Sequence, residues 1–474
     1  MKKVIITIRK QKFDILVRDI FKNYPHDEWG LFATTSWSME GETLAINLID
    51  FIHPEENEVT IGKGVVHFNE PYLVKGLKTI MRERSGMAVI HSHPERIRPF
   101  PSLIDDDMDG YLNEYFGSFS SKSPYLSLIF RKTSEGLVQF TGRGVYNQNE
   151  FVVTELRVVG KEIERILSLG VASEGIPDEI RERLKRLSES YGAEVPAKLW
   201  SSEVTIVGCG GTGSPSAHSL ARSGVGTINL VDFDVLNLHN SERVHGAFDK
   251  HFRNSGISKV QALKELIQLI NPRIKVNIHQ GSVLDPEAKE MILRSHVVLS
   301  CTDSEHAKVA LSEYVWRYNS VVLQVNVSLE SDISSVLAQV IHVTHLFPGG
   351  PCLYCMDMVN SQRLSQELMS AEESNLRQEA EKGAGEGVGA YWVSSPSVPT
   401  VGALATIGGE KISNFAIGLL SGKFLPVAHF SEEDLLSDQA GIHLNFKCRA
   451  DCVCQGGARG DQAGEKAILL PARF

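Results

Sequence analysis

EVTIVGCGGTGSPSAHSLARSGVGTINLVDFD, residues 203–234, is the stretch that decides the fold. The apolar residues Val204, Ile206 and Val207 suit a buried parallel strand, and a glycine-rich turn separates them from a helix that begins near Ser214. That helix presents its free N–H groups and positive dipole end to an anion in the turn. A second strand at 227–231 ends at Asp232, whose carboxylate can bind the ribose of a nucleotide. The pattern predicts a Rossmann-like nucleotide site with a phosphate-binding turn formed by Gly208, Gly210, Gly211 and Gly213.

Charged residues after this turn help to decide between two nucleotide chemistries. A glycine fingerprint alone is typical of a dinucleotide-binding dehydrogenase. Here Asp234, Asn240, Arg243 and Lys259 follow the ribose acid, and hydride transfer has no use for so many charges at the phosphate end. Adenylation does use them, because cations neutralise the triphosphate and an acid holds magnesium. The segment therefore favours ATP-dependent adenylation.

This half of the chain resembles the ThiF/MoeB family, whose adenylating core is shared with ubiquitin-activating enzymes. The resemblance is carried by DFDVLNLHNSERV at 232–244, GISK at 256–259 and LSCTDSEHAK at 299–308. It implies ATP and Mg²⁺ as cofactors, with Asp232 at the ribose and Asp303 at the magnesium. The second acid, the catalytic amide and the two cations of the family then correspond to Asp234, Asn240, Arg243 and Lys259.

Upstream, residues 181–200 (RERLKRLSESYGAEVPAKLW) resemble the arginine-bearing lead-in helix of the same family. The two arginine positions of that helix fall on Arg183 and Arg186. In relatives the second arginine reaches into the ATP site of a partner subunit. The resemblance therefore implies a homodimer, with Arg186 as a catalytic residue.

Composition limits the class of protein. The 474 residues predict two or three domains, and a formal net charge of −10 makes general nucleic-acid binding an unfavourable interpretation. No apolar run reaches the length of a membrane span, so a cytoplasmic protein without membrane contact is expected. All seven cysteines lie at or after residue 209, a clustering that is more typical of metal binding than of a secreted disulfide framework.

The first 145 residues alternate predicted helices (12–23 and 71–83) with predicted strands (29–34, 43–51 and 86–90). The last strand runs into His91-Ser92-His93-Pro94, and two histidines at i and i+2 point the same way and can share a metal. The following RPFPSLIDDDMDG, residues 98–110, offers an acid as third ligand. A zinc ion with two histidines, one aspartate and an open position suits amide hydrolysis.

These motifs resemble the JAB/MPN metalloproteases, which share the JAMM motif. The resemblance implies a zinc held by His91, His93 and Asp105, with Asp106 as an alternative ligand, and it makes Ser102 the residue that stabilises the oxyanion. The family's general-base position falls on Asp27, but its side chain is one methylene shorter than the usual glutamate, so the neighbouring Glu28 is the expected base and Asp27 the alternative. The activity implied is zinc-dependent cleavage of peptide or isopeptide bonds, and a domain of the same fold without activity is the alternative.

A second metal site is expected from cysteines. Cys352 and Cys355 form a CxxC unit, and a later group consists of Cys448, Cys452 and Cys454. In ThiF/MoeB relatives two such units hold a structural zinc. The spacing leaves open which two of the later three bind, with free or redox-active thiols as the alternative.

The expected architecture is α/β throughout: a JAB/MPN-like domain at 1–145, a helical linker at 146–174, a ThiF/MoeB-like domain with a mostly parallel sheet at 175–455, and a frayed tail at 456–474. The polar segment between 356 and 400 is expected to be a solvated helix or a loop that crosses the adenylate. An apolar helix is expected after it.

Together the two resemblances imply a bifunctional enzyme acting on the C-terminal glycine of a ubiquitin-like protein in bacterial conjugation. One domain would adenylate this glycine with ATP and the other would cleave after it. The alternative is activation of a sulphur carrier, with thiocarboxylate formation and trimming by the first domain, and a binding scaffold is the non-enzymatic hypothesis. The further partner would be a conjugating enzyme or a sulphurtransferase. The absence of cysteine between residues 355 and 448 slightly favours a route without a thioester.

Overall fold

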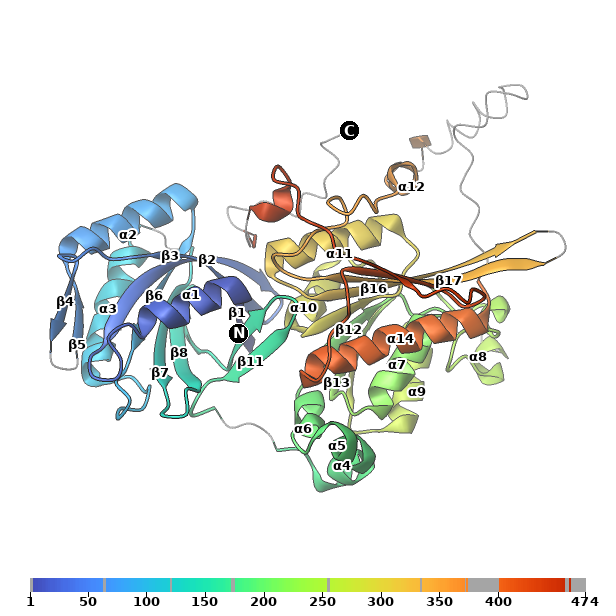
Figure 1. The fold of residues 1–474 in the computed structure, drawn as a ribbon, viewed down its shortest axis with the longest axis horizontal. Coiled ribbons are helices and arrows are strands. Elements are labelled where there is room, and N and C mark those ends of the chain that lie inside the picture. The colour runs from blue at the N-terminus through green and yellow to red at the C-terminus, as the bar shows by residue number, and fades with distance from the viewer. Residues whose placement is uncertain are drawn as a thin grey trace.

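The computed structural model describes residues 3–62, 65–119, 122–171, 175–253, 256–332, 335–370, 372–373, 400–456 and 460–461. These residues form two large sheets with flanking helices that lie side by side, the N-terminal one at the left of Figure 1. Most of the expected crossing segment, and most of the expected tail, lies outside the described residues.

The N-terminal sheet has nine strands. Their spatial order is β11 (Ile163–Leu167), β10 (Glu155–Val159), β1 (Lys3–Arg9), β3 (Thr43–Ile52), β2 (Trp29–Glu40), β6 (Gly86–Ser92), β7 (Tyr125–Lys132), β8 (Val138–Tyr146) and β9 (Asn149–Val152). The helices are α1 (Lys10–Ile20), α2 (Glu70–Glu83) and α3 (Leu103–Gly117), and a separate hairpin comprises β4 (Val59–Gly62) and β5 (Val65–Phe68). The helices and strands expected before residue 91 are confirmed. Every residue of the central strand β6 is buried, as its continuous apolar run predicts.

The expected helical linker at 146–174 is wrong. This range instead contains strands β9, β10 and β11, which extend the N-terminal sheet at both of its edges. Alternation explains the error: Leu156 and Val158 pack into the N-terminal core, while the charged Glu155 and Arg157 are also buried, and Arg157 contacts the end of α10. A charged residue at every second position therefore did not mark a solvent-exposed face.

The second sheet has eight strands in the order β14 (Lys275–His279), β13 (Thr227–Val231), β12 (Glu203–Val207), β15 (Val297–Ser300), β16 (Val322–Ser331), β17 (Val336–Leu346), β18 (Phe430–Asp434) and β19 (Ile442–Leu444). The first five are parallel and the last three pairings are antiparallel. The expected Rossmann-like sheet is therefore confirmed, with an antiparallel extension. The chain turns to opposite sides of β12 for β13 and β15, so a crevice for ligands is expected at their carboxyl ends.

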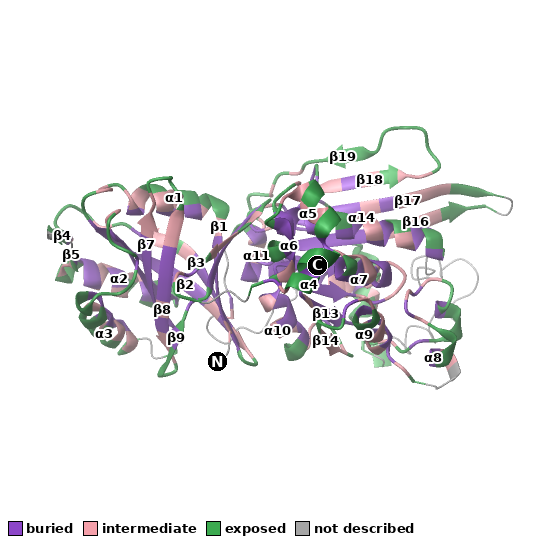
Figure 2. Cartoon of the chain, turned by 90° about the horizontal axis from the view of Figure 1, so that it is seen from below, coloured by how far each residue is buried: buried purple, intermediate pink, exposed green. Residues whose placement is uncertain are grey.

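Helices cover both faces of this sheet (Figure 1). They are α4 (Asp178–Arg183), α5 (Lys185–Tyr191), α6 (Val195–Trp200), α7 (Gly213–Arg222), α8 (Asp249–Arg253), α9 (Lys259–Ile270), α10 (Pro286–Arg294), α11 (Glu305–Tyr318), α12 (Ser361–Glu367) and α14 (Gly402–Ser421), with short 3-10 turns at Leu238–Asn240 and Val453–Gln455. The expected apolar helix is α14, which packs against α7 and β16. Figure 2 shows the buried residues concentrated in the central strands of both sheets.

A buried polar seam joins the two sheets. The guanidinium of Arg157 donates to Glu155 at 2.6 Å and to two backbone carbonyls at the end of α10. His296 accepts from the backbone N–H of Glu203 at 3.0 Å through Nδ1, which leaves Nε2 to donate to Glu155 at 3.1 Å. Lys3 pairs with Glu203 at 2.8 Å. Each charge in the seam thus has a partner from the other sheet or from its own, as buried charges require.

Part of the expected frayed tail, 456–474, is docked at this seam instead. The carboxylate of Asp461 accepts from Lys289 of α10 at 2.5 Å, from the hydroxyl of Tyr318 of α11 at 2.5 Å, and from the hydroxyl of Ser38 of β2. Asp461 therefore contacts both halves of the chain: Ser38 in the N-terminal half, and Lys289 and Tyr318 in the other. Its negative charge is compensated by the ammonium of Lys289.

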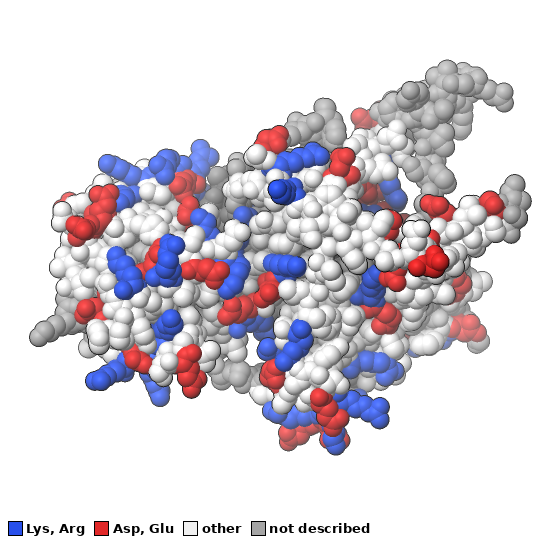
Figure 3. Space-filling view, in the orientation of Figure 1, with Lys and Arg blue, Asp and Glu red and all other residues white. Residues whose placement is uncertain are grey.

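Within the described ranges, no helix is both long and apolar enough to cross a bilayer. On the face seen in Figure 3, acidic and basic side chains alternate over both halves of the molecule, without a large area of one sign.

Candidate functional site

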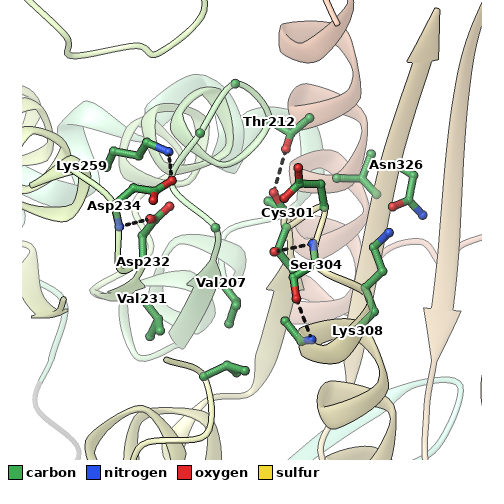
Figure 4. A pocket seen from close by; sticks show the side chains of 18 of the residues that line it. Val207, Thr212, Val231, Asp232, Asp234, Lys259, Cys301, Ser304, Lys308 and Asn326 are labelled. Carbon is green, nitrogen blue, oxygen red and sulfur yellow. Dashed lines mark hydrogen bonds and ion pairs between the residues drawn. The ribbon is translucent and has the colours of Figure 1, made fainter. Parts of the chain in front are cut away.

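A pocket of about 670 Å³ opens at the carboxyl ends of β12, β13 and β15, where the strand order predicts a ligand crevice. Its lining brings together most of the nucleotide-site residues expected from the sequence: Gly208, Gly210, Gly211, Asp232, Asp234, Asn240, Arg243, Lys259 and Asp303. Figure 4 shows Asp232, Asp234 and Lys259 on one side of the pocket and Ser304, Lys308 and Asn326 on the other.

Two glycines explain the shape of the turn. Gly208 has a φ of +90°, a conformation that side chains rarely adopt, and a Cβ there would lie 2.6 Å from the carbonyl oxygen of Cys301. A Cβ on Gly213 would lie 1.8 Å from the carbonyl oxygen of Gly208. Gly213 is therefore packed beneath the turn as the first residue of α7, rather than among the lining residues, and the turn's backbone can approach a ligand closely.

Asp232 is held by backbone donors. Its Oδ2 accepts from the N–H of Cys209 at 2.6 Å and its Oδ1 from the N–H of Asp234 at 2.8 Å. Burial raises the pKa of this carboxyl. The thiol of Cys209 is fully buried.

The charged side of the pocket centres on Asp234 and Lys259, whose carboxylate and ammonium lie 2.5 Å apart. Asn240 is buried and its side-chain oxygen accepts from the N–H of Asn237 at 2.9 Å, which fixes the amide in the 3-10 turn. Arg243 lies over the glycine turn, 3.5 Å from where a Cβ of Gly211 would be. The two cations Arg243 and Lys259 lie with the fixed amide of Asn240 at a phosphate-binding turn. This combination suits a polyphosphate ligand.

Asp303 lies at the mouth, with a side chain 92% exposed and 3.8 Å from Arg363 of α12. The neighbouring Glu367 of α12 accepts from the backbone N–H groups of Glu305 and His306 and from the hydroxyl of Ser304. A carboxylate of α12 thus caps the N-terminus of α11 beside Asp303.

Sequence reasoning missed two polar residues, Lys308 and Asn326, on the side of the pocket opposite Lys259. Lys308 belongs to the segment LSCTDSEHAK that carries the family resemblance, one helical turn after the cap of α11, and that position is the signal that could have identified it. Asn326 is on β16, inside an apolar strand, and no motif marks it.

Arg186 does not line the pocket. It is exposed on α5, whereas Arg183 donates to Glu179 and to the carbonyl of Ile270.

A second cluster lies in the N-terminal sheet, where His91, His93 and Asp105 are buried and present ligand atoms within 4.8 Å of one another. Neither ring nitrogen of His91 has a hydrogen-bond partner among the described residues, although Nε2 lies 3.1 Å from Asp105. Nδ1 of His93 contacts the carbonyl of Arg98 at 3.0 Å, which leaves Nε2 to face Asp105. Two histidines, one aspartate and unsatisfied ring nitrogens fit a zinc ion.

The residues around this cluster separate the alternatives left open by the sequence. Glu28 is buried beside it, and burial raises the pKa of its carboxyl to about 7. Asp27 is exposed, and Asp106 is exposed and paired with Arg143 at 2.5 Å. Ser102 caps α3, and its hydroxyl donates to Asp105 at 2.7 Å.

A third cluster is formed by cysteines. The thiols of Cys352, Cys355, Cys452 and Cys454 lie within 4.8 Å of one another and could hold a metal ion. Cys448 packs beside these thiols but is not one of the four, and it contacts the carbonyl of Gly349 at 3.8 Å. Four thiols in this arrangement fit a structural zinc.

Comparison with known proteins matches part of this chain. The model of the ThiF family matches residues 183–441. The chain is 32% identical over 151 residues to the probable adenylyltransferase/sulfurtransferase MoeZ of Mycobacterium tuberculosis, which covers 29% of this chain and 37% of the relative. Adenylyltransferase and sulfurtransferase uba4 of Pyricularia oryzae is 31% identical over 170 residues, with 35% and 34% covered. The tRNA threonylcarbamoyladenosine dehydratase of Escherichia coli is 33% identical over 144 residues, with 30% and 52% covered. The chain therefore spans a third to about half of these relatives' own length.

Proposed function

The chain belongs to the ThiF family, and from that premise we propose that it adenylates the C-terminal carboxylate of a sulphur-carrier or other ubiquitin-like protein. The observation that carries the proposal is the pocket at the end of β12, in which the glycine turn, Asp232, Arg243, Lys259 and Asp303 meet. Its volume and its charges suit ATP, with the ribose at Asp232 and the phosphates at the turn.

In this reaction a carboxylate oxygen attacks the α-phosphorus of ATP, and pyrophosphate leaves. Arg243 and Lys259 stabilise the charge that grows on the phosphates, and Asn240 supplies a fixed amide donor. Asp303 would hold magnesium, which neutralises phosphate charge when bound. The guanidinium of Arg363 lies 3.8 Å from Asp303 and is close enough to compete with magnesium for that carboxylate.

The sulphur-carrier version is favoured over conjugation. Two of the relatives described above are named both adenylyltransferase and sulfurtransferase. The cysteine cluster supports the same choice, because four thiols committed to a metal are not free to form a thioester. We extend the proposal to a homodimer in which Arg186, exposed on α5, reaches a partner's pocket.

The test is pyrophosphate release from ATP by the purified full chain with glycine-terminated sulphur carriers as substrates. Wild-type protein is expected to release pyrophosphate only when a carrier is present, and Asp303→Asn should lower the rate at least about a hundredfold. Lys275→Met, at an exposed lysine of β14, is the control. Mass spectrometry of the carrier separates the two versions, since a thiocarboxylate replaces one oxygen by sulphur. Undiminished release by Asp303→Asn would contradict the proposal.

A second activity, peptide or isopeptide cleavage at the N-terminal cluster, is favoured by the buried group of His91, His93 and Asp105 with Glu28 beside it. Zinc there would supply a polarised water. Glu28 would take the proton of that water and pass it to the leaving amine, and the hydroxyl of Ser102 would turn from Asp105 to donate to the carbonyl oxygen as it gains charge. We propose that this domain comprises residues 3–171 and is a JAB/MPN-like metalloprotease.

Cleavage of a fusion that follows a carrier's terminal glycine tests this activity. His93→Ala is expected to abolish both cleavage and zinc binding at this cluster. Cleavage by a zinc-free protein at the wild-type rate would reject it.

A further inference from the structure

The pocket has a second cationic wall, formed by the first turns of α11. Lys308 lies on this wall with its side chain 12% exposed, and Figure 4 shows it reaching toward Asn326, across the pocket from Lys259. Burial lowers the pKa of its ammonium. The positive charge of Lys308 is therefore only weakly solvated by water.

The two lysines of the pocket differ in their counter-charges. Lys259 is 2.5 Å from Asp234, so much of its charge is already balanced. Among the described residues, the one ion pair of Lys308 joins it to Glu305 at 3.7 Å, beyond hydrogen-bond distance. The other oxygen of Glu305 accepts from the N–H of Asn360. A buried ammonium with so weak a partner gains from a bound anion or carbonyl oxygen.

The proposed reaction requires a second binding position in this pocket, for the carboxylate that attacks ATP. The phosphates of ATP suit the glycine turn and Lys259, whereas the attacking carboxylate must be held apart from them, because like charges repel. The wall of Lys308 and Asn326 offers a cation and an amide donor on the opposite side, beside Asp303.

We propose that Lys308, assisted by the amide of Asn326, binds the carboxylate of the acyl substrate and orients it toward the α-phosphorus. This assignment rests on the adenylation proposed above. One carboxylate oxygen forms the new bond to phosphorus, the bond from phosphorus to pyrophosphate breaks, and pyrophosphate carries away the negative charge. The other oxygen becomes the carbonyl of the mixed anhydride and still accepts from Lys308. No proton has to move.

Calorimetric titration with three ligands tests the assignment: ATP, sulfamoyl adenosine, and glycyl-sulfamoyl adenosine, a stable mimic of a glycyl adenylate. The last two differ only in the acyl group. In the wild-type chain the glycyl compound should bind more tightly. Lys308→Met, which keeps the length of the side chain, should weaken the glycyl compound about tenfold to a hundredfold and leave ATP and sulfamoyl adenosine unchanged. Lys308→Arg should restore most of the difference.

Other outcomes overturn the assignment in distinguishable ways. If Lys308→Met weakens all three ligands equally, or none, Lys308 does not read the acyl group, although adenylation can stand. If the wild-type chain binds neither ATP nor the mimic, the adenylation proposal fails together with this assignment. Unfolding temperatures of both variants close to that of wild type are required for the comparison, and Lys275→Met supplies the matched control.

Discussion

Glu28 and His93 face each other across two strands, with Oε1 of the carboxyl 3.9 Å from Nε2 of the ring. Their approach follows from the antiparallel register of β2 and β6, in which Trp29 pairs with Ser92 and Gly30 pairs with His91. Side chains alternate along a strand, so Glu28, which directly precedes β2, lies on the same face as the two histidines, whereas Asp27 is in the bend before it and is exposed. Register thus selects the acid that can act at this cluster.

Glu28→Gln should lower the rate of cleavage after a carrier's terminal glycine by about a hundredfold or more, because the amide cannot take a proton. Zinc content should stay at the wild-type level, since Glu28 is not among the three grouped ligands. Asp27→Asn is the matched control and should cleave normally. The reverse pattern, with Asp27→Asn inactive, would move the base to Asp27.

The cysteine cluster makes a prediction about metal content. Cys454→Ser should lose about one zinc ion per chain and unfold at a lower temperature, because metal binding contributes to the folding free energy of such sites. Cys448→Ser should keep its zinc, since that thiol stands outside the cluster. Elemental analysis of the purified variants checks both, and loss of zinc from Cys448→Ser would show that the fourth ligand is misassigned.

The seam should weaken in acid through His296. Burial, with Arg157 nearby, lowers the pKa of this ring to about 3, below the value of 6.5 for a free histidine. The unfolded chain therefore binds a proton that the folded chain rejects. This contribution to stability is intact above pH 6.5 and falls by about 1.4 kcal/mol per pH unit as the pH drops toward 3.

Urea unfolding at about pH 7 and about pH 5 measures this slope. His296→Gln should unfold more easily than wild type at neutral pH and should show a smaller loss between the two conditions. His443→Gln, at an exposed histidine of β19, should retain the wild-type difference. An unchanged slope in His296→Gln would show that other groups cause the acid sensitivity.

Asp461→Asn should destabilise the protein by about 1–3 kcal/mol, because Lys289 would keep only Glu40 as a charged partner and the hydroxyls of Tyr318 and Ser38 would lose a charged acceptor at a partly buried position. Asp451→Asn, a change of the same kind at an exposed site, should have little effect. Thermal unfolding compares the two variants. Equal unfolding temperatures would mean that the docked residue adds nothing to the seam.

The sequence was most informative where a motif is local. The glycine turn, the HSHP segment and the CxxC unit each combine a backbone requirement with its chemistry within a few residues, and each lies in a site of the structure. Strands near the predicted zinc ligands were also correct, because a buried apolar run such as 86–90 has few alternatives.

Contacts between residues far apart in the sequence could not be predicted in this way. Glu155 and Arg157 carry charges that suggest a solvent-exposed helix, yet both are buried in a strand because His296 and the end of α10 compensate them. Asp461 is docked by partners from three separate elements, and no local pattern announces such a site. Lys308 was missed for a related reason: only the folded pocket shows that its ammonium lacks a close counter-charge.

The buried seam also determines how the two candidate sites could share a substrate. Lys3, Arg157, His296 and Asp461 bond the two halves of the chain to each other, so a movement of one candidate site toward the other would have to break these bonds. If both proposed activities hold, a carrier's tail would reach the second site by leaving the first, and not through a swing of one half of the chain. Trimming and activation would be separate encounters, and the relative amounts of precursor and mature carrier in the cell, rather than a motion of this chain, would determine which happens next.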